Sequence, residues 1–371
     1  MSHFAVLVIG NNIEQQLQPY HEFECTGTDD QYVQDVDITE EKRAEFADAT
    51  RSMIRCPNGE LVYRYDDRFY RDPTEAEQNE IGTVGGTGSC NGSHYTSKYW
   101  GDGRGYRPKV HFIPEGHEAV DVPFESFRDY LADYCSIAEL SIDNPLDMEK
   151  THKYGYARIV NGEVEKVIYR TNPNKKWDWW EVGGRWSGFL KLKNGATGTL
   201  GRRGLMGACA DDGPGRADAA RKGDIDFDGM RDASGTKAAE RWDKAAAARG
   251  DATWHSWEHV RHVLHPGNIS AARDAYHAQP AAKAVSKALD NPWDGVDEYL
   301  VPRDQYIQQA RDQATVLYAL VKDGKWIARG DMGWFGMSND HGSQDDWNRK
   351  VNELLGALPD DTLITVVDCH I

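Results

Sequence analysis

The chain lacks any apolar run that approaches the length of a membrane span. Its 371 residues have a mean hydropathy of −0.70, whereas a bilayer-crossing helix needs roughly 20 mostly apolar residues. Residues 1–10 hold only a short apolar run and no basic segment, which predicts a buried strand rather than a signal peptide. We therefore expect a soluble protein with no membrane partner, located in the cytoplasm.

Cysteine pairs and repeats are also missing. The six cysteines are scattered and no two are spaced as Cys-x-x-Cys, which excludes a disulfide scaffold in a chain of this length and favours free thiols. No internal repeat and no compositional linker divides the sequence. We accordingly expect one elaborated domain over residues 1–371.

Basic charge is scarce, because 43 Lys and Arg oppose 60 Asp and Glu for a net charge of −17. Bulk nucleic-acid binding needs clustered positive charge to neutralise phosphates, so the composition argues against it. Residues 175–203 are a basic exception within the acidic chain. They form either a solvated strand face or a patch for a polyanion.

The order of apolar patterns predicts an α+β fold. Strand patterns occupy residues 3–9, 154–170, 314–329 and 363–368, and helical patterns occupy residues 236–290 and 345–358. We expect a central, mostly antiparallel, ferredoxin-like sheet containing both terminal strands, because such an arrangement makes those strands neighbours. The expected core is residues 1–20, 150–195 and 313–371, with helical and loop insertions over 21–149 and 196–312.

The most informative segment is Lys176–Gly188, which combines four tryptophans, two carboxylates, an arginine and three glycines. Indole rings could stack a base or a sugar, the Arg185 guanidinium could grip a phosphate, and Asp178 or Glu181 could accept hydrogen bonds from hydroxyls. The alternative is a pair of amphipathic strands whose rings pack beneath a loop, with Gly183 and Gly184 as a bulge. Asp331 and Trp334 occur in a glycine-flanked turn that would extend the same aromatic cleft, or would form a hydrophobic lid.

The end of the chain, Asp368-Cys369-His370, could meet His3 if the first and last strands are neighbours. Adjacent strand residues point to opposite faces, so Asp368 and His370 could share a site while Cys369 could not. The alternative is that these residues only cap the final strand.

Two further clusters raise the question of metal binding. Asp224, Asp226 and Asp228 alternate along one segment, but the glutamate that would complete a calcium loop is missing at the twelfth position. His255, His259 and His262 follow helical spacing without the His-Glu-x-x-His motif of zinc enzymes. Loop carboxylates that cap a helix and a polar helix face explain both, so we predict no metal and no cofactor.

Several of these segments together resemble a family of uncharacterised proteins of tailed bacteriophages and related prophages. The similarity rests on five segments: Met1–Phe4 with Val6–Gly10, Lys176–Trp179 with Gly183–Trp186, Lys222–Phe227, Gly330–Trp334, and Leu358–Thr362 with Asp368–Ile371. The resemblance implies a phage setting, and it carries no activity to transfer.

Three functions follow as hypotheses. The first is a phage accessory protein in the host cytoplasm that binds a nucleotide-like ligand or a host protein, in counter-defence or host takeover. Its ligand would lie against Trp177, Trp180, Trp186, Asp331, Trp334 and His370. The second is a hydrolase of phosphoester or glycosidic bonds that uses Asp178 or Glu181 as acid or base, with Arg185 holding the anion. The third is a virion component, for which the sequence offers no repeat or coiled coil.

Overall fold

The structure is a computed structural model that describes residues 3–75, 88–90, 93–100, 105–133, 137–141, 155–203, 213–291, 295–332 and 337–371. The chain divides into two compact units. Unit 1 comprises Met1–Val33 with Asn172–Ile371, and unit 2 comprises Gln34–Thr171. No described helix is long and apolar enough to cross a bilayer.

Unit 1 contains strands from both ends of the chain and most of the helices. In chain order its elements are β1 (His3–Ile9), α1 (Ile13–Leu17), η1 (Gln18–Tyr20), α2 (Phe23–Thr26), β13 (Trp179–Gly184), β14 (Leu190–Lys191), β15 (Arg202–Arg203), β16 (Arg216–Ala217), β17 (Ala219–Arg221), η4 (Lys222–Asp224), α6 (Phe227–Arg249), α7 (Trp257–His259), η5 (Val260–Leu264), α8 (Ile269–Ala278), α9 (Pro280–Ala288), η6 (Asp297–Leu300), α10 (Arg303–Gln313), β18 (Ala319–Lys322), β19 (Lys325–Ala328), β20 (Gly330–Met332), β21 (Ser338–Asp340), α11 (Gln344–Ala357) and β22 (Leu363–His370).

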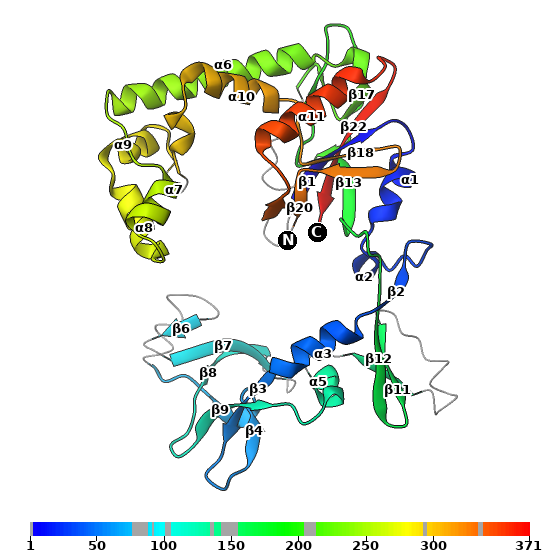
Figure 1. The fold of residues 1–371 in the computed structure, drawn as a ribbon, viewed down its shortest axis with the longest axis vertical. Helices are drawn as coiled ribbons and strands as arrows, with labels where there is room; N and C mark the ends of the chain where they lie inside the picture. Colours follow the sequence, from blue (N-terminus) through cyan, green and yellow to red (C-terminus); the bar gives the residue numbers. More distant parts are fainter. Residues whose placement is uncertain are drawn as a thin grey trace. The chain divides into compact units, whose positions relative to one another are not determined.

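The central sheet of unit 1 has the strand order β15-β13-β22-β1-β18-β19, and β17 also pairs with β22. Most neighbours are antiparallel, while β1 is parallel to β18 and β13 is parallel to β15. The first and last strands pair along their whole length, from His3 opposite His370 to Ile9 opposite Ile364. The α+β class and the shared sheet of the two terminal strands are therefore confirmed, and Figure 1 shows both ends of the chain close together.

Alternating side chains of β1 and β22 build a core on each face of this sheet. One face carries Leu7 and Val366 and is covered by α11, whose Trp347, Val351 and Leu355 follow helical spacing. The other face carries buried side chains that include Val8, Val367 and Cys369, and Leu17 of α1 packs against it. Because both faces are apolar, β1 and β22 are buried along nearly their whole length.

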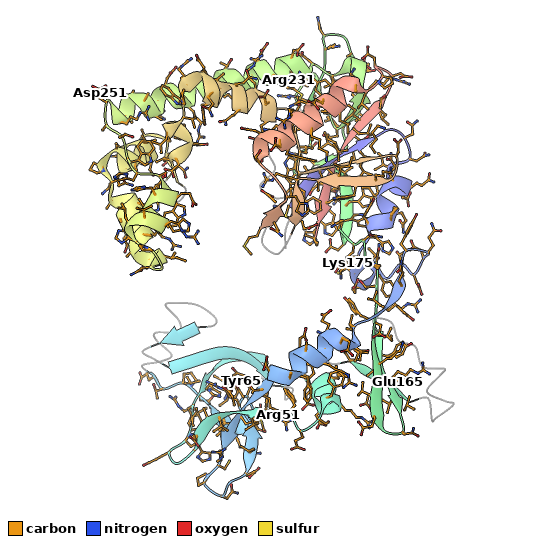
Figure 2. The ribbon with its side chains drawn as sticks, in the orientation of Figure 1. Arg51, Tyr65, Glu165, Lys175, Arg231 and Asp251 are labelled. Atoms are coloured by element: carbon orange, nitrogen blue, oxygen red, sulfur yellow. The ribbon has the colours of Figure 1, made fainter. Side chains whose placement is uncertain are left out.

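A helical region of unit 1 has its own apolar core. Residues of α6 through α10, among them Trp254, Tyr276, Val285 and Tyr299, pack together there. The long helix α6 begins at its N-cap Asp226, whose side chain accepts a hydrogen bond from the backbone N–H of Gly229. In Figure 1 this helix runs alongside α10, and the two make extensive contact. Arg231, labelled in Figure 2, donates a hydrogen bond to Asn352 and so joins α6 to α11.

The described residues of unit 2 form three small sheets, the helices α3 and α5, and the short helix η2. Its elements are β2 (Gln34–Asp37), α3 (Thr39–Asp48), β3 (Thr50–Arg55), β4 (Leu61–Tyr63), η2 (Asp67–Phe69), β5 (Tyr70–Arg71), β6 (Gly88–Cys90), β7 (Ser93–Trp100), β8 (Gly105–His111), β9 (Glu118–Pro123), α5 (Phe127–Asp133), β10 (Ala138–Ser141), β11 (Gly155–Val160) and β12 (Glu163–Thr171). The sheets have the orders β10-β11-β12-β2, β4-β3-β9 and β5-β8-β7-β6.

The hairpin of β11 and β12 forms as expected around Asn161 and Gly162, both with positive φ. It belongs to a sheet of unit 2, however, so the expected core segment 150–195 is divided between the two units. Residues 216–222 form β16, β17 and the start of η4. Pairing of β17 with β22 outweighs the helix propensity of this alanine-containing segment.

Candidate functional site

Three aromatic rings form a triangular cluster at one end of the central sheet. Residue 370 of β22 lies opposite His3 of β1 on one side and opposite Trp179 of β13 on the other. The two imidazole centroids are 4.9 Å apart with an interplanar angle of 73°. The Trp179 indole stacks on His370 at 5.3 Å and contacts His3 edge-on at 5.3 Å. Trp179 is 39% exposed, so the cluster opens to solvent at the indole.

Nδ1 of each histidine in this cluster lies within hydrogen-bonding distance of a different carboxylate. His3 Nδ1 lies 2.9 Å from Asp368 Oδ1, and His370 Nδ1 lies 2.7 Å and 2.8 Å from the two carboxylate oxygens of Asp178. Asp368 is 1% exposed and His370 is 5% exposed. When Nδ1–H donates to a carboxylate, the neutral ring presents an unprotonated Nε2, which is the form that accepts a proton or binds a ligand.

Strand geometry accounts for the pairing. Asp368 and His370 are two residues apart on β22 and therefore project from the same face, and His3 lies opposite His370 on the neighbouring strand. Asp178 immediately precedes β13, and its backbone N–H donates to the carbonyl of His370 at 2.9 Å. We define the four residues His3, Asp368, His370 and Asp178 as the twin dyads.

A tight turn after β13 wraps around two buried carboxylates. Gly183 and Gly184 both have positive φ, and a Cβ on either one would collide with Asp218 or Asp368, respectively. The backbone N–H of Arg185 donates to Asp368 Oδ2 at 2.8 Å. The glycine pair of the sequence motif is therefore required by left-handed backbone and by the close approach of carboxylates.

Asp218 holds the other side of this turn. It is fully buried and accepts hydrogen bonds from the hydroxyl of Ser187 at 3.1 Å and from the backbone N–H groups of Gly188 and Gly201 at 2.5 Å and 2.7 Å. Three donors satisfy the acceptor capacity that burial would otherwise leave uncompensated. Nothing in the sequence pattern distinguished Asp218, because its partners are backbone groups brought close only by folding.

The guanidinium of Arg185 makes no hydrogen bond or ion pair with the described residues, although the side chain is half-buried. Its backbone is bonded to Asp368, which places Arg185 next to the twin dyads. A half-buried cation without a protein partner is suited to bind an anion.

Beside Asp178 lies a second group of polar side chains. Glu22, Cys25 and Asp178 offer ligand atoms within 4.8 Å of one another, and they are the group of three among the described residues that could converge on a metal ion. Partial burial, a hydrogen bond to Glu22 and the negative charge of Asp178 raise the pKa of the Cys25 thiol to about 11. Lys175, labelled in Figure 2, balances this charge through ion pairs with Glu22 at 3.0 Å and Glu24 at 2.7 Å.

The predicted tryptophan cleft is divided between the two faces of the sheet. Trp177 is 6% exposed and its indole N–H donates to the carbonyl of Leu17, and Trp180 packs edge-on against it. Both belong to the core on the α1 face, so our expectation that they line a ligand cleft is corrected. Trp186 packs on the opposite face and lines a hollow next to His3. The reason is strand alternation, which turns Trp180 away from Trp179.

The other predicted site residues have varied surroundings. The Asp178 carboxylate lies 2.7 Å from Nδ1 of His370. Glu181 is largely buried, and its carboxylate lies 3.7 Å from Nε of Arg202. Asp331 is exposed and pairs with Lys176 at 3.2 Å and His341 at 3.0 Å, which links two of the sequence motifs. Trp334 lies outside the described residues.

The two clusters considered as metal sites have other partners. Asp226 caps α6 and pairs with Lys191 at 2.8 Å, and Asp228 pairs with Arg231. His255 and His259 stack on each other at 4.6 Å, and His262 pairs with Glu258. Within the described ranges, neither cluster gathers three ligand atoms around one point.

The sequence predicts that the chain ends meet and that Asp368 and His370 share a face, but it does not pair Asp178 with His370 or single out Trp179. The signal for Trp179 is its alternation with the half-buried Trp180 and its position two residues before Glu181. Comparison of the chain with known protein families, with curated proteins and with solved structures found no match.

Proposed function

We propose that this protein is a hydrolase that cleaves a phosphoester bond in a nucleotide-like small molecule at the twin dyads. One observation carries the proposal: two imidazoles 4.9 Å apart each use Nδ1 for a carboxylate, and so each presents Nε2 for proton transfer. A pair of this kind can supply a general base and a general acid to one reaction.

The chemistry of the step balances without a further reactant. One neutral imidazole takes a proton from water as the water oxygen bonds to phosphorus. The ester P–O bond breaks, and the other imidazole, in its protonated form, gives its proton to the leaving oxygen. Proton exchange with solvent then restores both rings.

Neighbouring groups support an anionic substrate. The unpartnered guanidinium of Arg185 would neutralise charge on the phosphate. Asp178 and Asp368 would act as positioning residues that keep the rings oriented and stabilise their protonated forms. Glycosidic hydrolysis is a weaker candidate, because it needs one free carboxylate and one protonated carboxyl group, whereas both carboxylates of the dyads accept from imidazoles.

A pure binding function for a nucleotide-like ligand or a host protein is the second candidate. It is favoured by the exposed indole of Trp179, which offers a stacking surface at the mouth of the site. The resemblance to proteins of tailed bacteriophages adds a setting to either function: an accessory protein in the host cytoplasm, in counter-defence or host takeover. A virion component is the least supported, since neither a repeat nor a coiled-coil pattern occurs in the sequence.

The test is a turnover assay of the full chain against nucleoside mono-, di- and triphosphates, cyclic nucleotides and dinucleotides, with products separated by chromatography. We expect His3→Gln and His370→Gln each to lower kcat by about 100-fold or more. The control is His262→Gln, which removes an exposed imidazole paired with Glu258 and leaves the twin dyads intact.

Calorimetric titration of the same ligands separates the two candidates. Binding without turnover in the wild-type protein would refute the hydrolase and leave the binding function. Turnover that survives in the double variant His3→Gln/His370→Gln would show that the twin dyads are not the catalytic groups.

A further inference from the structure

A hollow of about 310 Å³ adjoins the twin dyads on the α11 face of the sheet. His3 contributes to its lining, so the hollow and the His3–Asp368 dyad share a residue. Ligand pockets in proteins begin at roughly this size, with space for a ring system of nucleobase dimensions. A substrate held at the dyads would therefore have a neighbouring compartment for its non-reacting part.

The walls of this hollow suit a flat, uncharged group. Trp186, Tyr318 and Met332 supply aromatic and thioether surface. The cation among the lining residues, Arg329, is already neutralised by Asp340 at 2.6 Å and hydrogen-bonded to Gln344. Charge for an anion is available instead at Arg185, beside the dyads. Because the available positive charge lies at Arg185 and not in the hollow, a phosphate would bind at the twin dyads and an uncharged ring in the hollow.

A hydrogen-bonding edge is present at the rim. Gln313 lines the hollow, and its exposed carboxamide makes no hydrogen bond with the described residues. A free amide carries both a donor and an acceptor, and this combination matches the paired donor and acceptor on the edge of a nucleobase. By contrast, the amide of Gln344 is engaged by Arg329 and Asn348.

We propose that this hollow is the nucleobase subsite of the protein. The inference rests on the proposed function, because it assumes that the phosphate of the ligand lies at the twin dyads. The base stacks against Trp186 and forms hydrogen bonds with Gln313. The phosphate lies at His3 and His370. The substrate class is accordingly a nucleoside phosphoester and not a sugar phosphate without a base.

Calorimetric titration with adenosine, guanosine, cytidine, uridine and ribose 5-phosphate tests the subsite without requiring turnover. We expect at least one nucleoside to bind, with affinity reduced about tenfold or more in Trp186→Leu and reduced in Gln313→Ala. The exposed Gln313 side chain can be removed without affecting the core, which covers the case in which Trp186→Leu fails to fold. The matched controls are Trp257→Leu and Gln308→Ala in the helical region.

The two proposals fail in different ways. If nucleosides bind, the Gln313 and Trp186 variants weaken this binding, and no phosphoester is cleaved, the subsite is supported and the hydrolase is refuted. If phosphoesters with and without a nucleobase are cleaved equally well, or if no nucleoside binds, the proposed nucleobase subsite is refuted. The hydrolase proposal then depends on the kcat values of the His3 and His370 variants.

Discussion

Asp218 and Asp368 are both buried carboxylates that hold the turn after β13, but their partners differ. The Asp218 carboxylate accepts hydrogen bonds from Ser187 and Gly188 of the turn and from the neighbouring Gly201, so the group is saturated by structural donors. Asp368 gives one oxygen to the backbone of Arg185 and the other to the ring of His3. The same turn is therefore bound by one carboxylate whose partners are structural donors and by another that also contacts the ring of His3.

Replacing the saturated carboxylate has the largest expected effect. Asp218→Ala leaves the buried backbone N–H of Gly188, the N–H of Gly201 and the buried hydroxyl of Ser187 without this partner, and we expect the free energy of unfolding to fall by about 4 kcal/mol. Urea denaturation measures the loss. Asp368→Asn retains an acceptor for Arg185, so we expect a loss of about 1 kcal/mol together with a fall in kcat of about 100-fold.

Asp228→Ala is the control, because this carboxylate is almost fully exposed and should change stability by less than about 0.5 kcal/mol. If Asp368→Asn proves as destabilising as Asp218→Ala, the two carboxylates have the same structural role and the contrast between them fails.

The glycine that faces Asp368 gives a second test of the comparison. Gly184→Ala combines a positive φ with a collision against the Asp368 side chain, and we expect a loss of about 3 kcal/mol in urea denaturation. Gly195 has a similar positive φ with nothing near its Cβ position, so Gly195→Ala isolates the backbone cost of about 1 kcal/mol. Equal losses in the two variants would contradict the close packing of the turn on Asp368.

The carboxylate of the other dyad can be probed through Cys25. Because its pKa is raised to about 11, we expect this thiol to be alkylated by iodoacetamide about tenfold more slowly at pH 7.5 than an ordinary peptide thiol. The rate should rise with pH until about pH 11. Glu22→Gln removes a hydrogen-bond partner and a negative charge that raise the pKa, so it should accelerate the reaction.

Peptide mapping by mass spectrometry identifies the modified cysteine, and the buried Cys369 is the internal control for local unfolding. A wild-type rate equal to that of a free peptide would show that Glu22 and Asp178 do not act on the thiol.

The smallest expected effect concerns a carboxylate near the surface. Lys191 and the backbone N–H of Gly229 lower the pKa of Asp226 below its ordinary value of 3.8. Its contribution to stability is therefore complete above about pH 5 and is lost as the pH falls through the folded-state pKa. Asp226→Ala should cost about 1 kcal/mol at neutral pH, and Asp226→Asn less, because asparagine still caps α6.

Thermal denaturation between pH 3 and pH 7 measures this dependence. The difference between wild type and Asp226→Asn should narrow toward pH 3. A difference that widens there would contradict the lowered pKa.

The sequence alone determined the strands at both ends, the helix before the last strand, and the shared face of Asp368 and His370. These follow from apolar runs, helical spacing and the two-residue period of strands, which are properties of short segments. The tertiary structure decided which tryptophans became core, which carboxylate joined which histidine, and where the β11–β12 hairpin belongs. Trp177 and Trp179 are two positions apart, yet one is buried under α1 and the other opens to solvent. Asp178 and His370 are 192 positions apart, and only the register of β13 on β22 brings them together. Contacts between distant segments depend on strand order and register, and these are set by the packing of the whole sheet.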